Sequence, residues 1–259
     1  MFRVTIDDLT WLDRSPLAVS SAGVEGWWST PPRRSQPTEK VWDHGAWASR
    51  GNFHSPRLVV INSVSMYKTP DEHYRLWEAL NGLAGEPRKL TIENTVDKSR
   101  SAFAYGYVET DMPATRAREV NEFRVLVTCH DPLKYAVNAE TAKLTQQQSV
   151  TFFNRGNVPV YPIFTVRASQ SVEGGFRINT SDGQEPFRWQ GEFNQVAPVM
   201  VDGKKKLVTR GGLNETYRVT QRGWPYVPPN RKRTFTFTPA SAVANDKVWV
   251  DVSFRPAWL

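Results

Sequence analysis

The residues of this 259-residue chain that could do chemistry are few and loosely spaced. Asp43, His44 and His54 lie near one another in the sequence, and carboxylate and imidazole groups are common metal ligands. Their spacing matches no defined ligand motif, so a metal site there is only conceivable. His73 falls within a predicted helix and His130 after a predicted strand, and we expect both to be structural.

A pair of carboxylates is the second possible catalytic feature. Glu185 and Glu192 flank Trp189, and glycoside hydrolysis needs two carboxyl groups beside a bound sugar. Acidic residues at turns and strand edges produce the same spacing without any catalytic role. We favour this structural interpretation of Glu185 and Glu192. The chain has no Gly-rich phosphate loop after a strand, no Gly-x-Ser-x-Gly motif and no His-Glu-x-x-His motif. The sequence therefore predicts a non-enzymatic protein with no catalytic residues, metal or cofactor.

The positive charge of the chain, formally +7, is scattered along the sequence. The densest basic runs are Lys204-Lys205-Lys206 and Arg231-Lys232-Arg233, each beside turn residues. We expect both runs to lie at solvent-exposed hairpin tips. The alternative is that they contact a polyanion such as nucleic acid. The single cysteine, Cys129, excludes an intrachain disulfide. It lies in an alternating pattern, which predicts a packed core residue, with a reactive thiol as the alternative.

The composition predicts the elements that must position these residues. The 18 prolines, 16 glycines and 12% aromatic residues are typical of short strands joined by turns. The N-terminus does not resemble a signal peptide, and no apolar stretch approaches the roughly 20 residues that span a bilayer. We therefore expect a mainly β protein that is soluble where it is made.

One helix is predicted, over residues 70–81. Thr69-Pro70-Asp71-Glu72 is a capping box with proline at the first helical position. Asn81-Gly82 predicts a left-handed stop. The side chains expected to pack against a sheet are Tyr74, Trp77 and Leu80.

Strands are predicted in both halves of the chain from alternation and turn residues. In the first half they are expected at 57–66, 88–93, 102–108 and 119–129. In the second half they are expected at 160–166, 176–179, 197–201, 206–209, 234–238 and 247–254, which favours a two-sheet sandwich. Asp131-Pro132 and the polar segment Thr141 to Ser149 predict a linker, and hence two domains, 1–137 and 138–259.

A long irregular segment, Gly26 to Ser55, precedes the strand that begins at Arg57. Structureless loops of this length are usually functional, and aromatic residues and arginines are favoured at protein interfaces. We therefore expect this loop to reach a neighbouring subunit. The expected contact residues are Trp27, Trp28, Arg33, Arg34 and Trp47, with packing inside the chain as the alternative.

Several stretches follow one another in the order of a known family. They are His44-Gly45-Ala46 with Arg57 to Asn62, Cys129 to Tyr135 with its Asp-Pro-x-x-Tyr, Phe153 to Pro162, Met200 to Lys205, and Val252 to Trp258. Together they resemble the distal tail proteins of siphophages, the Dit family, including versions described as minor tail proteins. Asn62, where the family prefers glycine, and Pro228-Pro229-Asn230 depart from the pattern and put local turn geometry in doubt.

The resemblance implies a structural virion protein of a tailed phage. Residues 1–137 would be a β-sandwich with one α-helix that forms a ring, and residues 138–259 a galectin-like β-sandwich. The ring, expected to be hexameric, would join the tail tube to the tail-tip or baseplate complex. The implied partners are further copies of the chain, the tail tube protein, a tail-tip or tail-associated protein and the tape measure protein. DNA would pass through the lumen in transit, and the protein, made in the host cytoplasm, would not insert in a membrane.

Three other functions stay open at this point. The second domain could bind a host-surface carbohydrate, with Phe187 and Trp189 as the glycan contact. Glu185 and Glu192 could hydrolyse a polysaccharide. The net positive charge could bind nucleic acid, with a steep dependence on salt.

Overall fold

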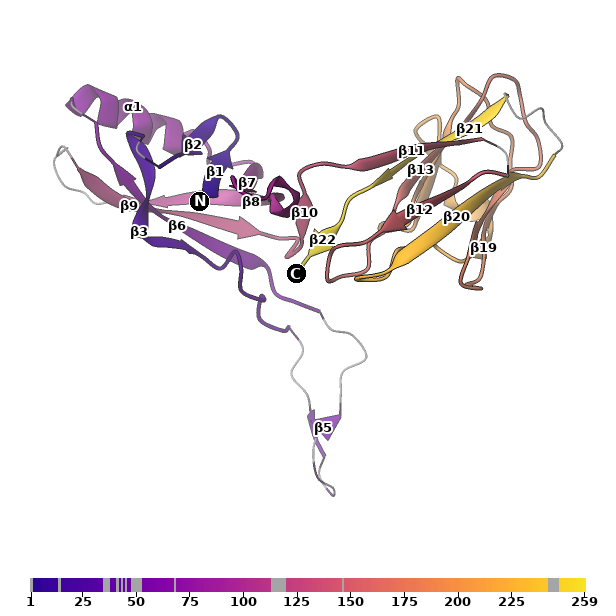
Figure 1. Cartoon of the computed structure of the whole chain (residues 1–259), viewed down its shortest axis with the longest axis horizontal. Helices are drawn as coiled ribbons and strands as arrows, with labels where there is room; N and C mark the ends of the chain where they lie inside the picture. Colours follow the sequence, from indigo (N-terminus) through magenta and orange to yellow (C-terminus); the bar gives the residue numbers. More distant parts are fainter. Residues whose placement is uncertain are drawn as a thin grey trace. The chain divides into compact units, whose positions relative to one another are not determined.

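The structure is a computed structural model that describes residues 2–13, 15–34, 38–40, 42, 44, 46–47, 53–67, 69–112, 120–145, 147–241 and 247–259. The chain divides into two compact units, Met1–Val137 with Leu259 (unit 1) and Asn138–Trp258 (unit 2). The described residues form mostly strands, with α1 (Pro70–Asn81) as their one α-helix (Figure 1). The predicted mainly β fold with one helix is confirmed. Among the described residues, no helix has the length and apolar character needed to cross a bilayer.

Unit 1 is built on an antiparallel sheet with the strand order β2-β1-β7-β8-β9-β6-β3, and β10 also pairs with β8. The strands are β1 (Phe2–Ile6), β2 (Leu9–Trp11), β3 (Leu17–Glu25), β6 (Arg57–Ser65), β7 (Arg88–Asn94), β8 (Ala102–Asp111), β9 (Asn121–Cys129) and β10 (Lys134–Ala136). Alternate residues of β9, from Phe123 to Cys129, are buried. The edge strands β2 and β3 lie close to each other, so the sheet curls around its core. A short 3-10 turn, η1 (Lys98–Arg100), joins β7 to β8.

The helix α1 covers one side of this sheet (Figure 1) and begins with the predicted capping box. The hydroxyl of Thr69 accepts a hydrogen bond from the N–H of Glu72 (3.4 Å), and the Glu72 carboxylate accepts one from the N–H of Thr69 (3.1 Å). The predicted left-handed stop is wrong, because Gly82 has φ −65°, a right-handed conformation.

The face of α1 that meets the sheet overlaps only partly with the predicted one, because Leu80 is buried as predicted and Trp77 is half-buried. Its buried residues are His73, Leu76 and Leu80, whereas Tyr74 is exposed. The imidazole of His73 is within hydrogen-bond distance of the Ser65 hydroxyl on β6 (3.2 Å). This contact satisfies a polar side chain in the core, so the helix presents His73 to the sheet in place of the neighbouring tyrosine.

Unit 2 is a sandwich of two antiparallel sheets, as predicted for the second half. The six-stranded sheet contains β11 (Glu140–Thr145), β21 (Val248–Phe254), β13 (Ile163–Ala168), β16 (Val199–Asp202), β17 (Leu207–Arg210) and β18 (Leu213–Asn214), in that order. The five-stranded sheet contains β12 (Ser149–Phe153), β20 (Lys232–Pro239), β14 (Phe176–Thr180), β15 (Phe187–Trp189) and β19 (Val219–Arg222). The 3-10 turn η2 (Thr216–Arg218) precedes β19, and β22 (Ala257–Trp258) ends the unit.

Aromatic side chains fill the space between the two sheets of unit 2. The rings of Phe164 and Phe235, on opposite sheets, have centroids 5.5 Å apart in an edge-to-face arrangement, which is a favourable geometry for aromatic pairs. Buried aromatic residues of the same core are Phe176, Phe187, Trp189, Phe193, Phe237 and Phe254. Burial of this much apolar surface is the main stabilising contribution of the sandwich.

The structure corrects one prediction about strands and adds a strand that was not predicted. The polar segment expected to be a linker contains β11, which pairs along its whole length with β21. Only Leu144 of β11 is buried, so the strand lacks the alternation of apolar and polar residues that would predict it. The strand β3 was not predicted, because its small residues and Gly23 lack the β-branched and aromatic signal.

Candidate assembly surface

The loop that follows β3 begins at a fixed position, because buried cations hold its first turn. Arg57, the first residue of β6, is 1% exposed. Its guanidinium donates to the carbonyl oxygens of Gly26 (2.6 Å), Trp27 (3.1 Å), Ser29 (2.7 Å) and Pro132 (3.0 Å). The Lys134 ammonium donates to the same Trp27 oxygen (2.7 Å). Gly26 has φ +77°, and a Cβ there would lie 1.9 Å from the Leu58 oxygen, so this turn requires glycine.

The electrostatics of this cluster follow from its burial. Desolvation, with the nearby charge of Arg57, lowers the pKa of Lys134 to about 8. Desolvation also lowers the pKa of Arg57 and raises the pKa of the adjacent Cys129 thiol to about 11. Cys129 is fully buried, which confirms the prediction of a core residue. Backbone carbonyls surround the two cations. Losing Arg57 would remove the side-chain donor of the Gly26, Ser29 and Pro132 oxygens, whereas the Trp27 oxygen accepts from both side chains.

Beyond this base, described residues on the two sides of the loop pair with each other. They form an arm, the name used here for the described residues between Pro31 and Ser55. The N–H of Arg34 donates to the Phe53 oxygen (2.8 Å), and the N–H of Ser55 donates to the Pro32 oxygen (2.9 Å). Farther along the arm, β4 (Thr38–Glu39) pairs with β5 (Ala46–Trp47). This short ladder stands away from the sheet of unit 1 (Figure 1).

The predicted contact residues of the loop have different environments. Trp27 is buried, with the Lys134 ammonium 5.6 Å from its ring centroid, so it packs within its own unit and is not an accessible anchor. Trp28 is 54% exposed, and Arg33 and Arg34 are exposed. The side chain of Trp47 lies outside the described residues.

Two aromatic residues of the arm were missed by the sequence reasoning. Trp42 is 95% exposed and Phe53 is 68% exposed. Both lie in the segment that was expected to reach a neighbour, and their aromatic type was the available signal. Large aromatics exposed to this degree are costly in isolation and are enriched in protein interfaces.

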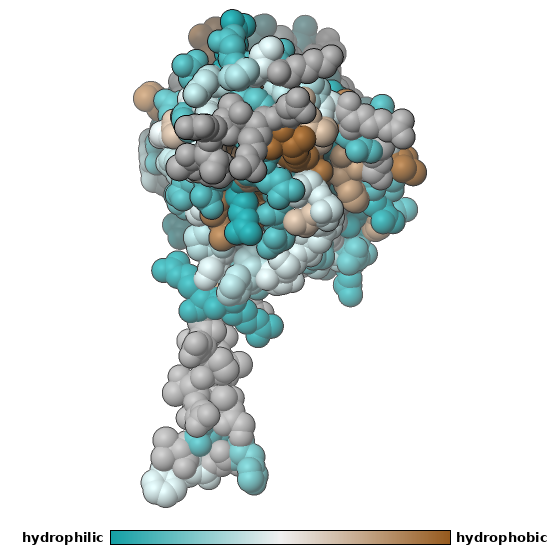
Figure 2. Space-filling view, turned by 90° about the vertical axis from the view of Figure 1, so that its left-hand side faces the viewer, coloured by the Kyte–Doolittle hydropathy of each residue, from teal (hydrophilic) through white to brown (hydrophobic). Residues whose placement is uncertain are grey.

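A groove of about 420 Å³ lies between β1 and β3 of unit 1. Its floor includes the buried residues Val4 and Trp11, and its rim carries Phe2 and Trp28, whose ring centroids are 5.1 Å apart. A register irregularity in β3 between Val19 and Val24 accompanies this opening. We call it the β1–β3 groove. Figure 2 shows one face of unit 1, on which hydrophobic residues gather in places between hydrophilic ones.

The conceivable metal site is not assembled by the described residues. His54 approaches the Pro31 oxygen with its Nδ1 (2.9 Å) and pairs with Arg33 in the stem of the arm. No group of three or more potential ligands comes together in the part of the chain that the structure describes. Asp43 lies outside it.

In unit 2, the prediction that Phe187 and Trp189 contact a glycan is wrong. Both side chains are fully buried, and both rings pack against Phe176, with centroids 6.3 and 5.6 Å away. The reason is the alternation of β15, which directs its first and third residues into the sandwich. Neither ring can stack on a sugar.

The other charged candidates in unit 2 lie at the surface. Glu185 and Glu192 are exposed on either side of buried Trp189, and Glu192 accepts a hydrogen bond from Ser171. Neither sits in the apolar pocket that a catalytic acid needs. The run Lys204-Lys205-Lys206 is exposed at the turn between β16 and β17, whereas Arg233 is buried in an ion pair with Asp182.

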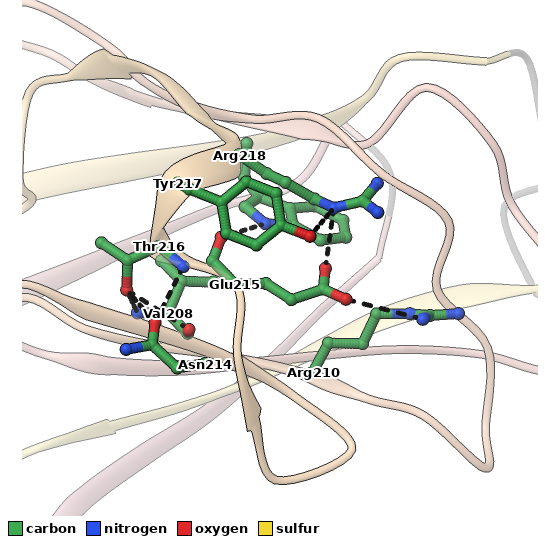
Figure 3. A network of polar contacts seen from close by, with 8 residues as sticks. Val208, Arg210, Asn214, Glu215, Thr216, Tyr217 and Arg218 are labelled. Carbon is green, nitrogen blue, oxygen red and sulfur yellow. Dashed lines mark hydrogen bonds and ion pairs between the residues drawn. The ribbon is translucent and has the colours of Figure 1, made fainter.

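An exposed aromatic residue of unit 2 lies in the Tyr217 turn, Leu213–Arg218 (Figure 3). The carboxylate of Glu215, only 11% exposed, forms ion pairs with Arg218 (3.3 Å) and Arg210 (3.7 Å). Arg218 Nε also donates to the Tyr217 hydroxyl (3.1 Å). Tyr217 and Leu213 are both largely exposed. The network therefore holds an exposed tyrosine in a fixed position, which lowers the entropy cost of using it in an interface.

Comparison with known proteins identifies unit 2. Residues 155–258 match the family model described as "Siphovirus-type tail component, C-terminal domain". Over these residues, unit 2 is similar to this tail-component family. The match confirms the resemblance to siphophage distal tail proteins. No curated protein matches the sequence.

The fold of the whole chain is also that of a known tail protein. The crystal structure of SPP1 Dit (gp 19.1), described as a paradigm of the hub of the adsorption apparatus in phages that infect Gram-positive bacteria, matches with a TM-score of 0.69. The match covers 100% of both chains at 18% identity, and at this identity it shows the fold alone. Two structures of the phage p2 baseplate in its activated conformation, with calcium and with strontium, match 94% of this chain and 100% of theirs. Their TM-scores of 0.40 and 0.41, at 10% and 9% identity, carry no argument.

The start of the tail-component domain explains one of the motifs that carried the resemblance. Asn154 is fully buried and its side chain accepts from the N–H of Gly156 (2.9 Å) and donates to the oxygen of Val158 (2.7 Å). A Cβ on Gly156 would lie 1.9 Å from the oxygen of Ala257. Asparagine and glycine are therefore needed at these positions to fold the entry of the domain against its last strand.

Proposed function

We propose that this chain is a structural distal tail protein of a siphophage. It forms a hexameric ring that joins the tail tube to the tail-tip or baseplate complex in the virion. The observation that carries the proposal is the match of unit 2 to the tail-component family, combined with the SPP1 Dit fold over the full length of the chain. The function is assembly, and the exposed carboxylates and histidines take no part in catalysis.

The ring contact that the surfaces of unit 1 favour is the arm of one copy seated in the β1–β3 groove of the next. A closed ring of identical subunits needs two different, complementary surfaces on each copy. The arm supplies Trp42 and Phe53, and the groove supplies the aromatic rim of Phe2 and Trp28. Central aromatic anchors of this kind contribute most of the affinity of protein interfaces.

The charges of the two surfaces support the same pairing. Arg33 and Arg34 are exposed on the arm. Asp13 lines the groove, and Glu25 ends β3 beside it. Opposite charges at the rim would increase the association rate and select the correct partner.

The proposed position of the ring, at the end of the tail tube, implies the remaining partners. The proposed partners are the tail tube protein, a tail-tip or tail-associated protein and the tape measure protein, and DNA passes through the lumen only in transit. In unit 2 the Tyr217 turn is the surface best suited to a protein partner of the tip complex, because its aromatic and arginine side chains are already held in place.

Native mass spectrometry and negative-stain imaging of the purified chain test the proposal. We expect an annular particle with six times the mass of the 29.5 kDa chain. The double variant Trp42→Ala/Phe53→Ala should shift the protein to the monomer, whereas Tyr74→Ala, a matched exposed aromatic on α1, should leave the ring intact. A chain that stays monomeric at high concentration, and that tail-tip partners do not draw into a ring, would overturn the proposal.

A further inference from the structure

One edge of the five-stranded sheet of unit 2 lacks the usual protection against pairing with another chain. The edge strand β12 has the sequence Ser-Val-Thr-Phe-Phe, with no charge and no proline, and its five residues pair with β20 in regular register. Of the other edge strands of unit 2, β11 carries Glu140 and Lys143, β18 has two residues, and β19 pairs with β15 through a register irregularity. Charges, short lengths and irregularities of this kind disfavour pairing at an edge, and β12 has none of them.

Alternate residues of β12 direct their backbone groups away from β20. Just beyond the strand, and in the same register, the N–H of Asn154 donates to the oxygen of Arg231 (3.0 Å). Hydrogen-bonded positions in an antiparallel pair alternate with positions whose N–H and C=O point outward. The outward positions of β12 are therefore Ser149, Thr151 and Phe153. Their side chains are exposed, and no strand in the part of the chain that the structure describes pairs with this side of β12.

The side chains at one end of this edge are basic and aromatic. Phe153 is 43% exposed and lies directly opposite Lys232 on β20. Arg231 and Lys232, from the second basic run of the sequence, are both exposed. Among the described residues, neither of them forms an ion pair. The edge therefore ends beside two positive charges that lack an acidic partner.

We propose that β12 binds an extended acidic segment of another protein, which adds a strand to the five-stranded sheet. Its backbone hydrogen-bonds with the outward groups of Ser149, Thr151 and Phe153, as peptides do at other exposed sheet edges. An antiparallel segment is favoured because antiparallel pairs are slightly more stable than parallel ones. This direction places the N-terminal end of the segment beside Phe153. Acidic residues at that end meet the charges of Arg231 and Lys232.

A second copy of this chain does not supply such a segment from its own β12. The residues that lead into the strand, from Thr145 to Gln148, are uncharged, and Arg155 follows it. In an antiparallel pair of two β12 strands, the basic end of each copy faces uncharged residues. In a parallel pair the two basic ends face each other, which is unfavourable. Charge complementarity therefore favours a different chain, and the proposed contact does not depend on the ring formed by unit 1.

Fluorescence anisotropy of labelled peptides titrated with the full-length chain tests the inference. The probes are Glu-Glu-Thr-Val-Thr-Val-Thr and the matched Lys-Lys-Thr-Val-Thr-Val-Thr. We expect saturable binding of the acidic peptide, about tenfold tighter than that of the basic one, because attraction replaces repulsion at two positions. The double variant Arg231→Glu/Lys232→Glu should reverse this preference.

A proline substitution tests whether the peptide binds as a strand. Thr151→Pro removes an outward N–H that the pairing with β20 does not use, and proline is tolerated at such edge positions. It should weaken binding of the acidic peptide by about tenfold or more. Thr151→Val is the control, because it keeps the N–H and should leave the affinity unchanged. If Thr151→Pro lowers the unfolding temperature, the charge-reversal variant decides alone, and an unchanged peptide preference would overturn the inference.

Three further results would overturn the inference. The first is the absence of saturable binding of the acidic peptide, or equal binding of both peptides. The second is equal affinity of Thr151→Pro and Thr151→Val in proteins with the same unfolding temperature, which would place the peptide elsewhere. The third is self-association of the chain that Thr151→Pro abolishes while no peptide binds, which would make a second copy the occupant. None of these results alters the ring test, because the side chains changed there lie in unit 1.

Discussion

The arm of unit 1 and the sandwich of unit 2 are both rich in aromatic residues and use them in opposite ways. In the sandwich, residues such as Phe176, Phe187 and Trp189 are fully enclosed between two sheets. On the arm, Trp42 and Phe53 are exposed to solvent. The difference shows that the environment, and not the residue type, decides whether an aromatic stabilises its own fold or is available to a partner.

The two regions also differ in how their backbones are held. The sandwich is stabilised by side chains packed between strands. The first turn of the loop after β3 is instead stabilised by the side chains of Arg57 and Lys134, which donate hydrogen bonds to its carbonyl oxygens. The base of the arm is therefore held by hydrogen bonds from these two side chains and not by rings packed between sheets.

The largest effect is expected in the sandwich core. Trp189→Ala should lower the free energy of unfolding of unit 2 by about 3–5 kcal/mol, because it leaves a large cavity among packed rings. Guanidinium unfolding followed by circular dichroism measures the change. Tyr217→Ala, the exposed control, should stay within about 0.5 kcal/mol of the original chain. A core variant as stable as the control would show that the sheets do not enclose Trp189.

The next effect concerns the base of the loop. Arg57→Ala should lower the free energy of unfolding of unit 1 by about 3 kcal/mol, because several buried carbonyl oxygens lose their donor. The arm should also become more sensitive to limited proteolysis. Arg75→Ala is the control, since this arginine is exposed and forms only a surface ion pair with Asp71. Equal stability and equal proteolysis of the two variants would contradict the role assigned to Arg57.

A smaller effect is expected from the titration of Lys134. Its pKa is about 8 in the folded chain and 10.5 ordinarily, so between these values the unfolded state binds more protons and stability rises with pH. Relative to Lys134→Met, the original chain should gain about 1 kcal/mol between pH 7 and pH 9. Denaturant unfolding at both pH values measures the gain. Cys129 is present in both proteins, so its own titration cancels, and parallel pH profiles would count against a buried ammonium.

The smallest effect on stability is expected at the groove rim. Trp28→Ala should change the free energy of unfolding by less than about 0.5 kcal/mol, because the side chain is more than half exposed. The same variant should weaken ring association by about tenfold or more if Trp28 anchors the next copy. Sedimentation velocity over a concentration series measures the association. An unchanged ring would remove the β1–β3 groove from the interface.

Much of the fold followed from local sequence signals. The capping box at Thr69 placed the start of α1, and strong alternation placed β9 and β21 close to their observed bounds. The strands β3 and β11 were missed because small and polar residues form them, and their pairing depends on neighbours distant in the sequence. The side of α1 that meets the sheet includes His73, whose imidazole contacts Ser65 and Asn121, and hydrophobic periodicity does not indicate a buried histidine.

The candidate surfaces were less predictable than the fold. The exposure of Trp28 and the burial of Trp27 differ although the residues are adjacent, because Arg57 and Lys134 fix the backbone between them. Phe187 and Trp189 were predicted to bind sugar. The three residues of β15 are too few for the sequence to show that the side chains of Phe187 and Trp189 point into the sandwich.

The pairing of β11 with β21 makes the first and last strands of unit 2 neighbours, with Glu140 opposite Phe254. The polypeptide thus enters and leaves this sandwich on one side. A domain with adjoining ends can be exchanged between genes as a cassette without rerouting the chain that precedes it. A gene for such a chain could in this way acquire a different second domain by recombination while the first domain stays the same.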